Sequence, residues 1–272
     1  MNPNKVLWEK GDYTRIARTM RESGEGLVRR AAITPQMKVL DLACGDGTTA
    51  IPAAQLGATV LGVDIASNLV ACAIVRAEQA GVAQRCRFQE GDARDLHNLD
   101  NASFDRVITI FGAMFAPQPF EVAREMVRVT KPGGRIVMGN WIPDDSTLFA
   151  QLTKICAAYT RPAPEGSMSP MAWGISSNVI ERFVAAGVAA DAITCLPATY
   201  GFNFSGAPED FVDTFRHCYG PTMTAFDAAA SDGRAQALRS ELVRLFESQN
   251  QSRRPGMTLI PATFLQVTVN VG

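Results

Sequence analysis

The sequence has few histidines, no closely paired cysteines, no excess of positive charge and no long apolar run. It has only two histidines, His97 and His217, and six cysteines with no C-x-x-C pair. These absences argue against a zinc site, a dense disulfide framework and a His-based metal centre. Lysine and arginine (26) balance aspartate and glutamate (27), for a formal net charge of -1. The chain therefore lacks the positive excess that non-specific binding of nucleic acid or an anionic membrane requires.

Long apolar runs are missing as well. The longest nearly apolar run, residues 107–117, is too short to span a bilayer. The first residues lack the apolar stretch of a signal peptide. We therefore expect a cytoplasmic protein with no metal and no membrane partner. The 47% of hydrophobic residues suffice for a buried core, and 272 residues fit one enlarged α/β domain.

Short β-branched runs and helical stretches alternate between residues 38 and 141. Strands are expected at 38–43, 59–64, 85–90, 104–111 and 135–141, and helices at 48–56, 67–80 and 120–130. Alternation at this spacing predicts βαβ crossovers and a mostly parallel sheet covered on both faces. Ligands of such sheets bind beyond the carboxyl ends of the strands, so the loops that follow the strands are the candidate sites.

The pattern changes after residue 141. Helices are expected at 146–159, 178–186, 209–219 and 225–247, and strands at 200–204 and 264–271. The last of these strands has no helix after it, so it is expected to pair with a strand already in the sheet. The helices between 143 and 258 could form a lid.

A glycine turn follows the first expected strand. Residues 45–50 satisfy the pattern G-x-G-x-x-G/A of dinucleotide-binding proteins, and Asp64 follows 17 residues after Gly47. A nicotinamide dehydrogenase is therefore one interpretation. The alternative interpretation of the glycine pattern is a tight strand–helix turn that binds no ligand.

Acidic residues near this turn favour a different cofactor. Asp41 and Asp46 would repel a pyrophosphate seated at the start of the helix. S-adenosylmethionine has no phosphate and carries an ammonium and a sulfonium. Asp64 could take both ribose hydroxyls, and the acid within Glu90-Gly91-Asp92-Ala93 could accept from an adenine amino group. Three acids at three successive strand ends are more specific than any one of them.

Five segments of the chain resemble class I S-adenosylmethionine-dependent methyltransferases. They are VLDLACGDG (39–47), VLGVD (60–64), EGDARDL (90–96), FDRVITIFGAMFAP (104–117) and RVTKPGGRI (128–136). Within that class the chain is similar to the methyltransferase type 11 family, which includes ubiquinone/menaquinone-type and many small-molecule enzymes. The resemblance implies a Rossmann-like, seven-stranded, mostly parallel sheet with an antiparallel last strand, helices on both faces and a helical lid insertion.

The same resemblance divides this single domain into four parts. N-terminal helices (1–37) would cover the cofactor site, and residues 38–142 would form the cofactor-binding core. A substrate lid with the remaining sheet elements would occupy 143–258, and the strand that completes the sheet would occupy 259–272.

The resemblance also implies which residues bind S-adenosylmethionine and its product S-adenosylhomocysteine. From the methionine end through the ribose to the adenine, and then along the surrounding walls, they are Asp41, Ala43, Gly45, Asp64, Ile65, Asp92, Ala93, Phe111, Gly112, Trp8 and Tyr13. Many members of the family have Leu-Pro after the adenine-binding acid. This chain has Leu96-His97 instead, a departure that bears on the shape of the loop.

Methyl transfer is an in-line displacement that needs a base only for some acceptors. His217 is the candidate base, with Asp213 at i,i+4 spacing to orient it. The alternative for this pair is a solvated helix face with a weak ion pair. His97 lies in a polar loop and is expected to face solvent.

Aromatic residues suggest an apolar substrate pocket. Its candidate residues are Phe115, Trp141, Trp173 and Tyr219. We therefore expect methyl transfer to a small, partly apolar organic molecule, with no nucleic-acid partner and the oligomeric state left open. An RNA or protein methyltransferase, or an NAD(P)-dependent Rossmann oxidoreductase, is the alternative.

Overall fold

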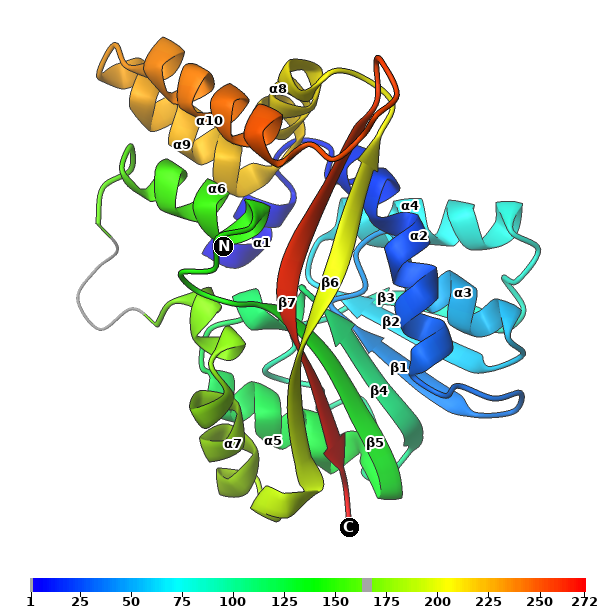
Figure 1. Ribbon diagram of the computed structural model, residues 1–272. Coiled ribbons are helices and arrows are strands. Elements are labelled where there is room, and N and C mark those ends of the chain that lie inside the picture. Colours follow the sequence, from blue (N-terminus) through cyan, green and yellow to red (C-terminus); the bar gives the residue numbers. More distant parts are fainter. Residues whose placement is uncertain (1, 163–167) are drawn as a thin grey trace. The chain divides into compact units, whose positions relative to one another are not determined.

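The computed structural model describes residues 2–162 and 168–272, and these residues include a seven-stranded sheet (Figure 1). Its strands are β1 (Lys38–Leu42), β2 (Thr59–Asp64), β3 (Cys86–Glu90), β4 (Phe104–Ile110), β5 (Thr130–Trp141), β6 (Ile193–Phe204) and β7 (Thr258–Asn270). The strand order is β3-β2-β1-β4-β5-β7-β6. Strands β1 to β5 pair in parallel and β7 runs antiparallel to β5. The Rossmann-like fold with an antiparallel last strand is thus confirmed.

The central strands are apolar because both of their faces are covered. In β1, Val39, Leu40 and Leu42 are fully buried, and in β4 the same holds for Val107 and Ile108. Continuous apolar runs of this kind are typical of parallel strands that have helices on both sides. Helices α3 (Ala50–Gln55) and α4 (Ser67–Gln79) lie on one face, and α5 (Pro119–Val129) and α7 (Ser176–Ala185) lie on the other (Figure 1).

Contacts divide the chain into two compact units. The first unit lies within Met1–Ser23, Pro143–Ser167 and Thr199–Thr263, and the second within Gly24–Ile142, Met168–Ala198 and Phe264–Gly272. The helices of the first unit are α1 (Pro3–Trp8), the start of α2 (Thr14–Arg30), α6 (Leu148–Ala157), α8 (Pro208–Cys218), α9 (Gly220–Ser231) and α10 (Ala235–Gln249). Helix α10 packs against α6, α8 and α9, with Phe211, Phe215 and Phe246 buried between them.

The second unit holds most of the sheet. It also contains the 3-10 helices η1 (Ala113–Phe115), η2 (Pro170–Gly174) and η3 (Ala190–Ala192). Helix α7 packs on α5 and on η2, and η2 in turn contacts β5 and η1. The end of β5 is therefore covered by η2 inside this unit.

Four expected elements have wrong bounds. Strand β6 starts at Ile193 rather than at 200, and strand β7 starts at Thr258 rather than at 264. The sequence predicted one helix over 225–247, but the chain forms α9 and α10, separated by a turn in which Gly233 has φ +69°. A left-handed glycine ends helices readily because it has no Cβ. Strand β5 starts at Thr130 rather than at 135, and its register against β4 shifts between the pairs Phe104↔Thr130 and Arg106↔Arg135. The segment Pro132-Gly133-Gly134 thus forms an irregularity inside the strand.

The expected lid range is divided between the two units. Of residues 143–258, residues 163–167 lie outside the described residues. Of the described residues, 143–162 and 199–258 belong to the first unit, and residues 168–198 belong to the second. No helix within residues 2–162 and 168–272 is long and apolar enough to cross a membrane.

Candidate functional site

The loop after β1 is built on left-handed backbone. Ala43 and Gly45 both have φ +55°, and Gly47 has φ +79°. The left-handed conformation is costly for alanine, and strain of this kind is concentrated at functional sites. A Cβ on Gly47 would lie 3.0 Å from the Phe88 ring and 3.2 Å from Ile51. The loop therefore needs glycine at position 47 in order to pack.

Asp41 is a buried carboxyl near the end of β1. Its side chain is 1% exposed. The Thr49 hydroxyl donates to Oδ2 at 2.6 Å, whereas Oδ1 has no hydrogen-bond partner within the described parts of the chain. Burial raises the pKa of Asp41 to about 7. Because a nearby cation would stabilise the ionised form and supply the missing partner, this carboxyl fits an ammonium group.

Asp64 joins the end of β2 to the β1 loop. Its Oδ2 accepts from the Gly45 backbone N–H at 2.8 Å, and its Oδ1 accepts from the Ala66 N–H at 2.9 Å. Burial raises the pKa of Asp64. Each carboxylate oxygen can accept a second hydrogen bond, so the geometry leaves acceptor capacity for a ligand hydroxyl.

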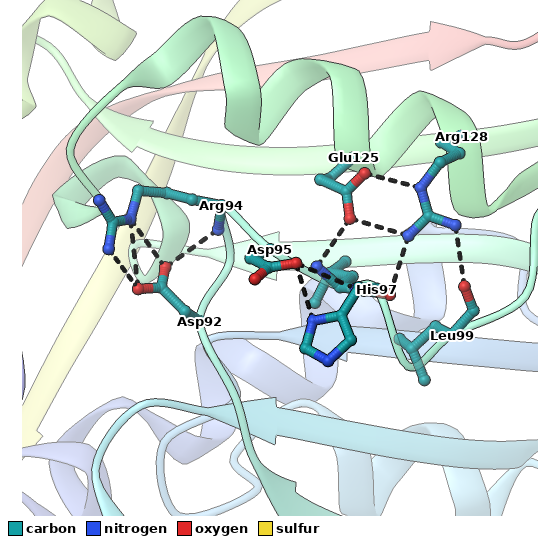
Figure 2. Close-up of polar contacts among 8 residues, drawn as sticks. Asp92, Arg94, Asp95, His97, Leu99, Glu125 and Arg128 are labelled. Atoms are coloured by element: carbon teal, nitrogen blue, oxygen red, sulfur yellow. Dashed lines mark hydrogen bonds and ion pairs between the residues drawn. The ribbon is translucent and has the colours of Figure 1, made fainter.

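Asp92 follows β3 and is held by Arg94 (Figure 2). Arg94 Nη2 lies 2.7 Å from Oδ2 and Nε lies 3.1 Å from Oδ1. Arg94 Nη1 also donates to Gln118 Oε1 at 3.2 Å. The fork fixes the plane of the Asp92 carboxylate, and the neighbouring Ala93 is buried.

The loop after β4 approaches the loop after β1. A Cβ on Gly112 would lie 2.4 Å from the Ala43 carbonyl oxygen, so only glycine permits this contact. Phe111 has φ +59°, and its ring stacks on Trp141 with the centroids 3.6 Å apart. Phe264 meets the Phe111 ring edge-on. The strand ends thus bring Ala43, Gly112 and an aromatic pair together.

The expected site residues fall into two groups by unit. The second unit contains most of them: Asp41, Ala43, Gly45, Asp64, Ile65, Asp92, Ala93, Phe111, Gly112, Phe115, Trp141 and Trp173. The first unit contains Trp8, Tyr13, His217 and Tyr219. Within it the Trp8 ring lies 5.7 Å from Tyr13 and 5.9 Å from Tyr219. The contribution of these four residues to a site stays a prediction.

Asp213 is paired with Arg239. Arg239 donates to its two oxygens, from Nε at 2.9 Å and from Nη2 at 2.7 Å, and this pairing lowers the pKa of Asp213. His217 itself is exposed. The geometry fits a solvated helix face, and a catalytic role for His217 stays a prediction.

His97 lies at the position where the resemblance led us to expect proline. Its backbone N–H donates to Asp95 Oδ1 at 3.3 Å, and its Nδ1 lies 2.9 Å from the same oxygen. Proline could not make the first of these bonds. The side chain is 80% exposed. Histidine at this position therefore adds a backbone hydrogen bond within the loop while its imidazole remains in solvent.

Two arginines that the sequence did not single out balance the acids. Arg76 of α4 pairs with the buried Asp46 at 2.9 Å and also donates to the Asp46 carbonyl. Arg94 pairs with Asp92 through the fork described above. The negative charge near the turn is thus smaller than the number of acids suggests, and repulsion of a pyrophosphate is correspondingly weaker. Arg76 lies 30 residues from Asp46, so no local spacing could have revealed the pair.

Across residues 2–162 and 168–272, no group of three or more His, Cys, Asp or Glu side chains could hold a metal ion.

Residues 40–138 match the family model described as "Methyltransferase domain". The chain is 34% identical to the uncharacterized protein Rv1405c of Mycobacterium tuberculosis over 249 residues, 89% of this chain and 84% of the relative. It is 37% identical to Methyltransferase GfsG of Streptomyces halstedii over 117 residues, 43% of this chain and 42% of that protein. The chain matches the solved structure of the YcgJ protein of Bacillus subtilis with TM-score 0.58 and 19% sequence identity. The match covers 92% of this chain and 99% of the YcgJ chain.

Proposed function

We propose, from the premise that this chain belongs to the class I S-adenosylmethionine-dependent methyltransferases, that it binds S-adenosylmethionine at the carboxyl ends of β1 to β4. We further propose that it transfers the methyl group to a small, partly apolar organic molecule. One observation carries the proposal. Asp41, Asp64 and Asp92 stand at or just beyond the ends of three neighbouring strands, β1, β2 and β3.

Each acid suits a different part of the cofactor. Asp41, whose Oδ1 has no partner among the residues that the structure describes, would accept from the ammonium at the methionine end. Asp64 retains acceptor capacity for the ribose hydroxyls, and Asp92 with the Ala93 N–H would meet the edge of the adenine. Ala43, Gly45, Ile65 and Gly112 would line the same groove of backbone. The cofactor, when bound, supplies an electrophilic methyl group on its sulfonium.

The protein's part in the reaction is to orient the acceptor and exclude water. The stacked Phe111 and Trp141 are both buried, and they supply an apolar wall beside the Gly112 loop. Phe115 and Trp173 extend the apolar character through η1 and η2, which contact each other. Holding a nucleophile in line with the methyl group is itself a large contribution to rate. An amine or thiolate acceptor would then need no base.

Calorimetry with S-adenosylhomocysteine tests the cofactor assignment. We expect saturable binding to the wild-type protein, and weaker binding to Asp64→Ala and to Asp92→Ala with the fold retained. Asp191→Ala, which removes an exposed carboxylate on η3, is the matched control and should bind as the wild type does. Unchanged affinity in both site variants would refute the residue assignment, and binding of NADP in place of S-adenosylhomocysteine would refute the cofactor.

The acceptor class has its own test. Radiolabelled S-adenosylmethionine is incubated with the protein and a panel of small metabolites, with bulk RNA, or with bulk protein. We expect label in a small, partly apolar metabolite. Label only in RNA or only in protein would favour the alternative methyltransferase classes.

A further inference from the structure

Two residues of α5 hold the loop between β3 and β4. Glu125 and Arg128 lie one turn apart on this helix and form what we name the loop clip (Figure 2). Arg128 Nε lies 2.6 Å from Glu125 Oε1, and Arg128 Nη2 lies 2.8 Å from Oε2. Both N–H···O contacts of a fork are made, which is the strong form of an arginine–carboxylate pair. The clip is therefore a fixed unit on the surface of α5.

The loop clip makes hydrogen bonds to both the backbone N–H and the backbone carbonyl of Leu96. Glu125 Oε2 accepts from the Leu96 N–H at 2.7 Å, and Arg128 Nη2 donates to the Leu96 carbonyl at 2.8 Å. The Leu96 side chain is buried. Leu96 is thus fixed through its N–H, its C=O and its side chain.

The same arginine holds the loop farther along. Arg128 Nη1 donates to the Leu99 carbonyl at 2.8 Å and to Asn101 Oδ1 at 2.7 Å. The Arg128 backbone carbonyl accepts from the Ala102 N–H at 2.9 Å. One residue of α5 therefore organises the loop from Leu96 to Ala102.

Short hydrogen-bonded turns connect the clip to Asp92. The Asp95 N–H donates to the Asp92 carbonyl at 3.0 Å, and the Arg94 N–H donates to the Asp92 carboxylate at 3.0 Å. Only three residues separate Asp92 from Leu96. Because this segment is short and bonded to itself, a shift of Leu96 would shift Asp92 and Ala93.

We propose that Glu125 and Arg128 are positioning residues for cofactor binding, acting through Leu96 on Asp92 and Ala93. This inference rests on the proposed function, in which Asp92 and Ala93 meet the adenine. A loop already ordered in the free protein binds more tightly, because its ordering cost is met before the ligand arrives. The clip supplies that order, although neither of its residues touches the cofactor.

The test compares three variants on one helix. Arg128→Gln removes the bonds to Leu96, Leu99 and Asn101, and Glu125→Gln removes the ion pair. Arg124→Gln is the matched control, because Arg124 and Glu121 form an ion pair with the same i,i+3 spacing on the exposed side of α5. Calorimetry gives the affinity for S-adenosylhomocysteine, and hydrogen exchange by mass spectrometry follows the amides of residues 92–101.

We expect Arg128→Gln to weaken S-adenosylhomocysteine binding roughly ten-fold, because a loop-ordering cost of about 1.4 kcal/mol would then be met only on binding. Exchange in residues 92–101 should become faster, while β1 and β2 stay protected. Glu125→Gln should show a smaller effect in the same direction, and Arg124→Gln should match the wild type. If Arg128→Gln does not fold, Arg128→Lys, which keeps the charge without the fork, gives the same comparison.

The outcomes separate this inference from the proposed function. Wild-type affinity in Arg128→Gln together with faster loop exchange would overturn the inference, because the clip would then be structural only. Equal losses of affinity in Arg124→Gln and Arg128→Gln would overturn it too. Failure of the wild-type protein to bind S-adenosylhomocysteine would instead refute the proposed function, and the inference with it.

Discussion

Replacing Asp41 by asparagine separates the charge of this buried carboxyl from its shape. Asparagine keeps the size of the side chain and an oxygen that can accept from the Thr49 hydroxyl, but it does not ionise. In the wild-type protein the side chain is 1% exposed and its pKa is raised by burial, from 3.8 to about 7. Ionised Asp41 therefore destabilises the folded state, and the Asp41→Asn variant carries no such penalty.

The sign and size follow from linkage. A carboxyl with a raised folded-state pKa contributes its full stability below pH 3.8 and loses it as pH rises to about 7, after which the loss is complete. Each pKa unit corresponds to about 1.4 kcal/mol, so a shift of about three units is worth about 4 kcal/mol. The difference in unfolding free energy between Asp41→Asn and the wild type should therefore shift in favour of the variant by about 4 kcal/mol as the pH is raised from 4 to 8.

Urea unfolding of both proteins at pH 4, 6 and 8 measures this quantity. The cost of burying an amide is the same at each pH, so the change in the difference between the two proteins isolates the ionisation of Asp41. A difference in unfolding free energy that stays constant from pH 4 to pH 8 would refute the reasoning. A change of the opposite sign would mean that Asp41 is held ionised by a positive neighbour.

Three further predictions concern the same region. S-adenosylhomocysteine affinity, measured by calorimetry, should rise with pH through about 7 in the wild type, because the ammonium favours ionised Asp41, and Asp41→Asn should lose this dependence. Gly112→Ala would place a Cβ 2.4 Å from the Ala43 carbonyl, so thermal unfolding should show a loss of about 1–3 kcal/mol; a neutral result would mean that the two loops can separate freely. Arg76→Gln leaves the buried Asp46 without its cation and should cost about 2 kcal/mol. Adding Asp46→Asn should recover part of that loss in a double-mutant cycle, and additive losses would contradict the pairing.

The strands of the core could be predicted closely because burial on both faces demands apolar runs. The second strand was expected at 59–64 and is found at Thr59–Asp64. Parallel strands place their carboxyl ends at one edge, so Asp41, Asp64 and Asp92 were expected to lie near one another. The helical region after β5 was predicted less well. Gly233 divides the expected helix 225–247, and one glycine within an alanine-rich run is a weak signal.

Residues that act through distant partners gave no local signal. Arg76 meets Asp46 across 30 residues, and Arg128 meets Leu96 across 32. Neither spacing corresponds to a helix or strand repeat. In contrast, Arg94 lies two residues from Asp92, and that pair could have been suspected from the loop sequence alone.

The sequence by itself determined the family, the order of strands and helices in the core, and which acids stand at the strand ends. Only the tertiary structure decided the state of those acids. Asp46 and Asp92 are paired with Arg76 and Arg94, while burial raises the pKa of Asp41 to about 7. Charge in a folded protein depends on desolvation and on distances between groups. Chain order fixes neither of these, so counting acids along the sequence overstates the negative charge at this site.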